Sequence, residues 1–475
     1  MIFNSIVFFV FLAAFLPVFF TLRGKAQVLW SLVGSYVFYG WWDWRFLSLI
    51  VASTLIDYVV GLQLSSTESP ARRKSLLLIS LTANLGLLGF FKYFNFFVES
   101  FRDLAAQFGY TPPASTLNIV LPVGISFYTF QTLSYSIDVY RREIPAERSL
   151  LNFATFVAFF PQLVAGPIVR AVDFLPQVHQ AHRFHRIEAM SGAAQMLLGF
   201  FKKVAVADTL ALVVDTVFDE PGVHTSIGLA TGVVLYAFQI YCDFSGYSDI
   251  AIGLARVMGY EFPANFRRPY VSQSFSEFWT RWHISLSSWL RDYLYIPLGG
   301  SRGGNYLTYR NLMLTMLIGG LWHGAHWKFV VWGGLHGLYL VGQRVLTWLA
   351  RRLAPDVTVP GWIKKPVLMA VVFTLTCIAW IPFRAHSLEQ AWDIFTRILQ
   401  FDSLDPRTIR NQFHVARCIL VVAILLGFEM ANKRFRLHEQ VLKRPVLAAG
   451  LFAAGLWLIA LLGTFGSQQF IYFQF

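Results

Sequence analysis

Residues 2–20 read IFNSIVFFVFLAAFLPVFF, and no charged side chain interrupts them. An α-helix of about 20 apolar residues spans the hydrocarbon core of a bilayer. The stretch has no basic region before it and no small-residue cleavage pattern after it, unlike a secretory leader. We therefore predict that it stays in the protein as the first transmembrane helix.

The rest of the 475-residue chain has the same character. Hydrophobic residues make up 56% and charged residues only 14% of the sequence, and the mean hydropathy is +0.53. These values exclude a set of soluble domains, in which about 25% of the residues are charged. We predict an all-α, polytopic integral membrane protein that forms a single domain over residues 1–475, with about eleven transmembrane helices.

Apolar windows between charged loops give the expected spans. They cover residues 2–21, 27–42, 46–64, 76–98, 118–138, 189–212, 226–242, 328–349, 366–383, 414–431 and 446–465. Lysine and arginine gather in the short loops, so the positive-inside rule explains the net charge of +13 better than nucleic-acid binding does. The same rule predicts that the N-terminus and the tail, residues 466–475, lie outside the cytoplasm.

Two regions depart from regular spans. Residues 151–169 are apolar but lie between two stretches that both look cytoplasmic, so we predict a re-entrant segment, broken at Pro161, Gly166 and Pro167. Residues 256–310 carry seven arginines and are therefore predicted to lie at the cytoplasmic face. Their serine and glutamate capping pattern and interleaved aromatic residues favour short amphipathic helices.

Two histidines, His323 and His326, lie at a predicted membrane depth, and His323 is the candidate for function. His323 is well inside the apolar segment 311–349, where an ionisable side chain faces the protein interior or a cavity and marks a candidate site. A histidine can act as the general base that deprotonates a hydroxyl group attacking a thioester. The alternative is a core histidine whose nitrogens are satisfied by neighbouring polar groups.

A second candidate, His283, lies in the predicted cytoplasmic region between Arg281 and Arg291. These three residues could meet an anionic donor such as a coenzyme A thioester. The alternative is an interfacial belt of aromatic and basic residues. Asp243 and Asp249 are nearby acids that could orient a histidine or cap a helix.

The sequence predicts no metal site and no permanently bound cofactor. Its three cysteines lie far apart in apolar runs without ligand spacing, so they are expected to be packing residues. His323 and His326 are close in sequence, but no carboxylate or third histidine accompanies them. We expect His326 and His336 to be interfacial or packing residues.

Two blocks, RWHISLSSWLRDYLYIPLGG (281–300) and GLWHGAHW (320–327), resemble the membrane-bound O-acyltransferase (MBOAT) family, and most of all its AlgI-type alginate O-acetyltransferases. The resemblance extends over nearly the whole chain. Its further pieces are NLGLLGFFKYFNFF (84–97), LPVGISFYTFQTLSY (121–135), FFPQLVAGPIVR (159–170), YCDFSGYSDIAIG (241–253) and WIPFRA (380–385).

The resemblance implies a helical funnel in which His323 is catalytic and His283 assists on the cytoplasmic side. It implies acetyl-CoA or another acyl thioester as the donor substrate, with Arg281, Arg291 and Trp322 as candidate donor-binding residues. The acyl group would cross the bacterial inner membrane. The implied partners are a periplasmic SGNH-type acetyltransferase and an exopolysaccharide synthesis and export complex, with membrane lipid around the protein.

The chain ends in FIYFQF, residues 470–475. Related D-alanine exporters use a small partner that ends in the motif F-x-Y-x-x-F, so the resemblance implies Tyr472 as a candidate acyl acceptor. The alternative is aromatic anchoring at the membrane interface.

These features predict an enzyme that passes an acetyl group across the membrane for O-acetylation of an exopolysaccharide such as alginate. One alternative is D-alanyl transfer to teichoic acid. Another is a non-enzymatic transporter or scaffold of polysaccharide export. A transporter would show paired intramembrane charges and repeat symmetry, and no internal repeat is visible in the sequence.

Overall fold

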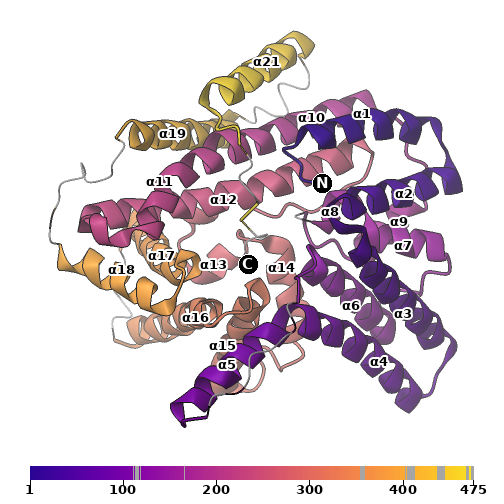
Figure 1. Cartoon of the computed structure of the whole chain (residues 1–475), viewed down its shortest axis with the longest axis horizontal. Helices are drawn as coiled ribbons and strands as arrows, with labels where there is room; N and C mark the ends of the chain where they lie inside the picture. Colours follow the sequence, from indigo (N-terminus) through magenta and orange to yellow (C-terminus); the bar gives the residue numbers. More distant parts are fainter. Residues whose placement is uncertain are drawn as a thin grey trace. The chain divides into compact units, whose positions relative to one another are not determined.

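The computed structural model describes residues 1–110, 112, 117, 119–164, 166–353, 359–401, 403, 412–435, 444–466 and 470–471. Within these residues, all regular secondary structure is helical and there is no β-strand (Figure 1). In lipid, a helix satisfies every backbone hydrogen bond within its own segment, so a chain this apolar favours helices. The all-α prediction is confirmed.

Several helical stretches are long and apolar enough to cross a membrane. Among the described residues they are Gly24–Ser66, Pro70–Gln107, Ser226–Val257, Gly361–Arg384 and Phe413–Asn432. Two shorter apolar helices are Ile6–Thr21 and Val446–Leu462. The prediction of a polytopic membrane protein is confirmed, whereas the count of eleven crossings stays a prediction because length and composition alone do not place a helix in the bilayer.

The chain divides into two compact units. The first comprises Met1–Gly192 and Ala251–Pro263. Its helices are α1 (Ile6–Thr21), α2 (Gly24–Asp43), α3 (Leu47–Ser66), α4 (Pro70–Leu88), α5 (Phe94–Gln107), α6 (Ile125–Arg141), α7 (Leu150–Ala158), α8 (Phe160–Leu163) and α9 (Ala171–Val178). Helices α3, α4 and α6 pack side by side (Figure 1).

A buried carboxyl group ties these three helices together. Asp57 of α3 accepts hydrogen bonds from Ser80 and, at 2.7 Å, from Asn84 Nδ2, both on α4. Ser136 Oγ of α6 donates to Asp57 Oδ1, also at 2.7 Å. Because a buried acid without partners is very costly, these donors explain why α3 can carry Asp57 in its packed face.

The segment predicted to be re-entrant is broken as its sequence suggests. Helix α7 ends at Ala158, and Phe159 leaves the helical conformation with a ψ of 112° before Pro161 enters the first turn of α8. Helix α8 ends at Leu163, after only one turn. Its membrane topology stays a prediction.

The second unit comprises Ala193–Ile250 and Ala264–Phe475. The chain passes between the units within α10 (Arg186–Phe200) and α12 (Ser226–Val257). The remaining helices are α11 (Asp208–Asp219), α13 (Phe275–Trp279), α14 (Ile284–Leu290), α15 (Gly304–His323), α16 (Trp327–Leu353), α17 (Gly361–Arg384), α18 (Leu388–Gln400), α19 (Gln412–Phe435) and α21 (Pro445–Leu462). A π-helical turn, Phe201–Ala207, joins α10 to α11.

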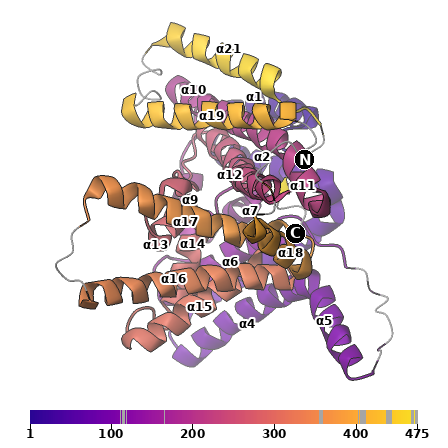
Figure 2. The ribbon, with the colours of Figure 1, turned by 90° about the vertical axis from the view of Figure 1, so that its left-hand side faces the viewer.

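Helices α15 and α16 form a closely packed hairpin (Figure 2). A β-carbon at Gly333 of α16 would lie 2.2 Å from the backbone oxygen of Met316, and one at Gly320 of α15 would lie 2.2 Å from the backbone oxygen of Phe329. Only glycine permits backbones to approach this closely. The hairpin turn fixes His323, the last residue of α15.

Residues 256–310 contain the short helices α13 and α14, as predicted. Ser274 caps α13 by accepting a hydrogen bond from the Glu277 N–H group at 3.0 Å. The Glu277 side chain reaches back to the Gln273 N–H group at 2.8 Å. The predicted serine and glutamate capping is therefore present, and it fixes where α13 begins, a few residues before His283.

Candidate functional site

His323 lies in an aromatic enclosure. Its imidazole is 4% exposed. The ring centre lies 4.9 Å from that of Trp332, 5.0 Å from that of Trp322 and 5.6 Å from that of Phe383. Trp332 comes from α16 and Phe383 from α17, so three helices build the surroundings of this histidine.

His283 occupies the start of α14 in an unusual conformation. Its backbone has a φ of 41°, in the left-handed region, where a side chain with a β-carbon is strained. Asn265 holds the first turn of α14. Its side-chain oxygen accepts from the N–H group of Ser285 at 3.2 Å and from the Ser285 hydroxyl at 2.9 Å, and its backbone oxygen accepts from Ile284 N–H at 2.9 Å. Backbone strain held by surrounding bonds is common at functional sites.

The structure brings the two candidate histidines together. The ring centres of His283 and His323 lie 6.4 Å apart, and Trp322 lies 5.8 Å from His283. Trp322 therefore borders both imidazoles. The two predicted catalytic residues, His283 and His323, therefore lie in one buried location with Trp322, a predicted donor-binding residue.

His283 is neutral at physiological pH. Its side chain is fully buried, and burial lowers the pKa of its imidazole from 6.5 to about 3. A neutral imidazole can accept a proton or a hydrogen bond, whereas an imidazolium can only donate. The ring can therefore accept a hydrogen bond next to His323 without becoming charged.

The aromatic cluster around the histidines contains unsatisfied polar atoms. Among the described residues, both ring nitrogens of His283 and the indole N–H groups of Trp279, Trp282 and Trp332 have no hydrogen-bond partner. Native proteins leave few buried polar groups unpaired, and such groups often mark a place for water or a ligand. This cluster therefore offers donors and acceptors to a polar substrate within apolar walls.

The two arginines predicted to bind the donor, Arg281 and Arg291, each form an ion pair with an acidic residue close in sequence. Arg281 donates to Glu277 Oε1 at 2.6 Å, and Arg291 donates to Asp292 Oδ1 at 2.6 Å. The side chain of Arg291 is 63% exposed. Their role in donor binding stays a prediction, since each would have to meet an anion while already paired.

The two other histidines of the motif region have distinct environments. His326 is exposed, and its Nδ1 accepts a hydrogen bond from the Lys328 N–H group at 3.1 Å, in the first turn of α16. His336 is fully buried, with its ring centre 4.8 Å from that of Trp332. The packing role expected for His336 agrees with this aromatic setting.

Phe470 and Ile471 of the tail are buried near His283. Phe470 is 0% exposed, and its ring lies 4.3 Å from that of Tyr247 and 5.9 Å from that of Phe244. The Phe244 ring in turn contacts His283, with ring centres 4.5 Å apart. Tyr472 itself lies outside the described residues, so its predicted role as acyl acceptor stays a prediction.

Sequence reasoning missed a group of buried ions. Lys203 pairs with Asp208 and Asp243, and Lys202 pairs with Asp249. Among the described residues, the charged partners of the two aspartates of α12 are therefore lysines, and neither aspartate pairs with a histidine. Two adjacent lysines inside the predicted span 189–212 were the available signal, because charges at membrane depth need partners. Paired charges were expected of a transporter, but the aromatic site and the relationships below indicate an enzyme.

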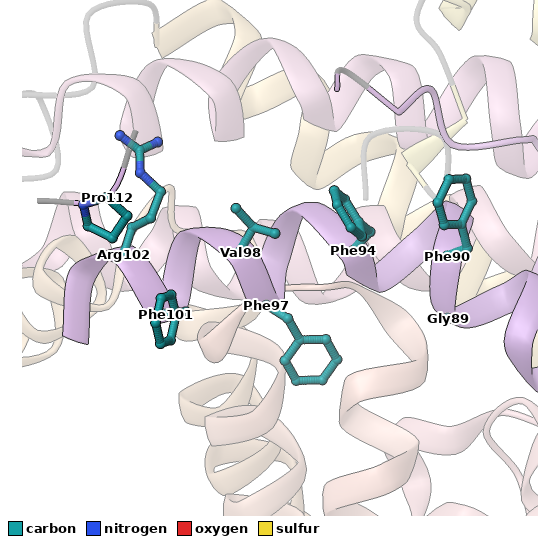
Figure 3. Close-up of a pocket in the computed structure, with 8 residues that line it drawn as sticks. All are labelled: Gly89, Phe90, Phe94, Phe97, Val98, Phe101, Arg102 and Pro112. Carbon is teal, nitrogen blue, oxygen red and sulfur yellow. The ribbon is translucent and has the colours of Figure 1, made fainter. Parts of the chain in front are cut away.

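A separate cavity of about 650 Å³ lies in the first unit (Figure 3). Side chains along α5 and the turn before it line it, and Arg102 stands beside Pro112 as its charged member. None of the described residues that line this cavity is a candidate catalytic residue. Within the described residues, no group of three or more His, Cys, Asp or Glu side chains could hold a metal ion.

The fold is that of a multi-pass helical membrane protein, and its candidate site is the buried histidine pair. The chain belongs to the membrane-bound O-acyltransferase family, whose model matches residues 42–382. The resemblance read from the sequence motifs is confirmed, and the protein is an acyltransferase.

The chain is similar over most of its length to named members of this family. It is 44% identical over 454 residues to the probable alginate O-acetylase AlgI of Pseudomonas aeruginosa, covering 94% of this chain and 85% of that protein. It is 37% identical to the peptidoglycan O-acetyltransferase of Helicobacter pylori, covering 80% and 77%. It is 30% identical over 233 residues to the teichoic acid D-alanyltransferase of Streptococcus thermophilus. This match covers 46% of this chain and 56% of that protein.

Proposed function

We propose that this protein transfers an acetyl group from a cytoplasmic thioester, such as acetyl-CoA, across the bacterial inner membrane for O-acetylation of an exopolysaccharide such as alginate. The buried pairing of His283 with His323 carries the proposal. The high identity to alginate O-acetylases over most of the chain supports acetyl as the group and a polysaccharide as the final acceptor.

In this proposal His323 is the general base. It accepts the phenolic proton of Tyr472 while the phenolic oxygen attacks the thioester carbonyl. The new bond joins that oxygen to the acetyl carbon, and the carbon–sulfur bond breaks. The proton then passes from His323 to the departing sulfur, which leaves as a thiol.

The neighbouring residues take supporting roles. His283, neutral and adjacent, accepts a hydrogen bond from an amide of the donor. Trp322, bordering both rings, forms a wall for the thioester arm. A periplasmic SGNH-type transferase would then move the acetyl group from the tyrosyl ester to the polymer, within an export complex.

D-alanyl transfer to teichoic acid is the second candidate function. The match to the D-alanyltransferase covers about half of the chain, whereas the matches to O-acetylating relatives cover at least four fifths. Chemical identification of the ester released from the polymer by mild base, acetate or D-alanine, separates the two.

The first experiment measures the O-acetyl content of exported polysaccharide in cells that carry His323→Ala. We expect a loss of about a hundredfold or more, because a general base contributes about that much. His326→Ala is the matched control, since this residue is exposed and lies in the same motif. Persistent acetylation in His323→Ala cells with normal protein levels would overturn the proposed mechanism.

A further inference from the structure

A buried ion triad lies in the second unit. The Lys203 ammonium is 2.8 Å from Asp208 Oδ1 and 2.6 Å from Asp243 Oδ1, and none of the three side chains is more than 4% exposed. Lys203 belongs to the π-helical turn Phe201–Ala207, and such turns occur often at functional sites. Charges this deep are costly to bury, so they call for an explanation beyond packing.

One carboxylate of the triad also holds the tail. Asp243 Oδ2 accepts a hydrogen bond from the backbone N–H group of Ile471 at 2.7 Å. The two oxygens of Asp243 therefore have different tasks, one toward Lys203 and the other toward the tail. A charged acceptor makes this bond stronger than a neutral one would be.

The same turn of α12 faces the histidine pair. Phe244, the next residue after Asp243, touches Phe470 on one side and His283 on the other. Tyr247, one turn later, packs on Phe470 and lies 5.6 Å from the Lys203 ammonium. The point where the tail is held is thus a single aromatic ring away from His283.

We infer that the Lys203–Asp208–Asp243 triad is a positioning device that seats the tail beside the histidines through the Ile471 N–H group. Lys203 and Asp208 orient the Asp243 carboxylate, which fixes the backbone of the residue that precedes Tyr472. This inference rests on the proposed function, because it gives the tail a place in the acyl transfer. The triad residues are positioning residues and touch no substrate.

A neighbouring ion pair provides the matched control. Lys202 Nζ lies 2.7 Å from Asp249 Oδ2, on the same two elements, and Gln195 donates to the same aspartate. Neither Lys202 nor Asp249 shows a contact with Ile471 in the described part of the chain. Asp249→Ala therefore removes the charge partner of the buried Lys202 without touching the hydrogen bond to the tail.

The test measures how accessible the tail is in the full-length protein. Ile471→Cys keeps the backbone N–H group and places a thiol at a position that is 4% exposed. The three native cysteines are buried and report on global unfolding. We expect maleimide labelling of Cys at 471 to accelerate about tenfold or more when Asp243→Ala is added, and to stay slow with Asp249→Ala.

A second pair of variants leaves the triad intact. Ile471→Pro removes the backbone N–H donor together with the isoleucine side chain. Ile471→Ala also removes most of that side chain but retains the N–H donor. We expect polymer acetylation to fall about tenfold or more in Ile471→Pro and to persist in Ile471→Ala. This pair decides the question even if Asp243→Ala fails to fold.

Equal labelling in the Asp243→Ala and Asp249→Ala backgrounds, or equal acetylation in the two Ile471 variants, would overturn the inference. The proposed function fails differently, through acetylation that survives His323→Ala. Slow labelling of the seated tail does not depend on activity. The two failures are therefore distinguishable.

Discussion

At the scale of single residues, His283 has two energetically unfavourable features, its burial and its backbone conformation. It is fully buried, and its backbone lies in the left-handed region with a φ of 41° and a ψ of 56°. Asparagine and glycine adopt this conformation with less strain. A buried residue in a strained conformation is a candidate for a functional role, in keeping with the place of His283 beside His323.

Burial of His283 makes stability depend on pH. Its pKa is about 3 in the folded protein and 6.5 in the unfolded chain, so the unfolded state binds more protons between these values. Stability is fully present above pH 6.5 and is lost as the pH falls toward 3. Between pH 8 and pH 5 the wild type should lose about 2 kcal/mol of unfolding free energy through this group.

The variant His283→Asn tests this prediction, because asparagine accepts positive φ and does not titrate. The measurement is the pH dependence of unfolding in detergent for both proteins. The wild type should lose stability on acidification more steeply than the variant. Parallel curves would show that His283 is protonated in the folded protein at a normal pH.

At the scale of elements, the hairpin of α15 and α16 fixes the position of His323. Gly333 faces the backbone of Met316, whereas a β-carbon at the neighbouring Gly334 would meet only the Leu317 side chain at 3.6 Å, an ordinary contact. Two adjacent glycines therefore differ sharply in the room that they have. Only the first requires the absence of a side chain.

We expect Gly333→Ala to destabilise the protein by about 1–3 kcal/mol and to lower acetylation, because the helices must separate and move His323. Gly334→Ala should be neutral or slightly stabilising, since alanine is the better helix former. Thermal melting in detergent and polymer O-acetyl content measure the two effects. Equal behaviour of the variants would contradict the close-packed hairpin.

At the scale of the whole molecule, polar side chains inside the first unit also support the fold. Removal of the Asp57 side chain leaves donors on Ser80, Asn84 and Ser136 without their acceptor. We expect Asp57→Ala to lower the free energy of unfolding by about 3 kcal/mol or more. The melting temperature in detergent checks this loss.

Asp43→Ala is the control for that variant. Asp43 pairs with Arg45, whose side chain is 71% exposed, and such an exposed ion pair contributes little to stability. A melting temperature for Asp57→Ala as high as that for Asp43→Ala would show that the buried network does not hold the unit together.

Local patterns in the sequence predicted the helical, membrane-embedded architecture. The spans 27–42 and 46–64 correspond to α2 and α3, and 366–383 corresponds to α17, because apolarity over one helix length is a local property. The motif resemblance also led to His283 and His323. Their pairing had no local signal, since it depends on how α14 and α15 pack.

Contacts between distant positions were beyond the sequence. Asp243 and Ile471 are 228 positions apart, and no sequence pattern near either residue predicts the hydrogen bond between them. The arginines show the opposite case. Arg281 and Arg291 looked available for an anionic donor, but Glu277 and Asp292 are close enough in the chain to pair with them.

The glycine contacts of the α15–α16 hairpin also bear on biogenesis. Neither helix is among the described stretches that are apolar and long enough to cross a membrane by themselves. A translocating chain that presented α15 alone would expose Asn311 and His323 to lipid. We expect the two helices to leave the insertion machinery as one preassembled pair, so that His323 is already shielded by the partner helix when the pair inserts.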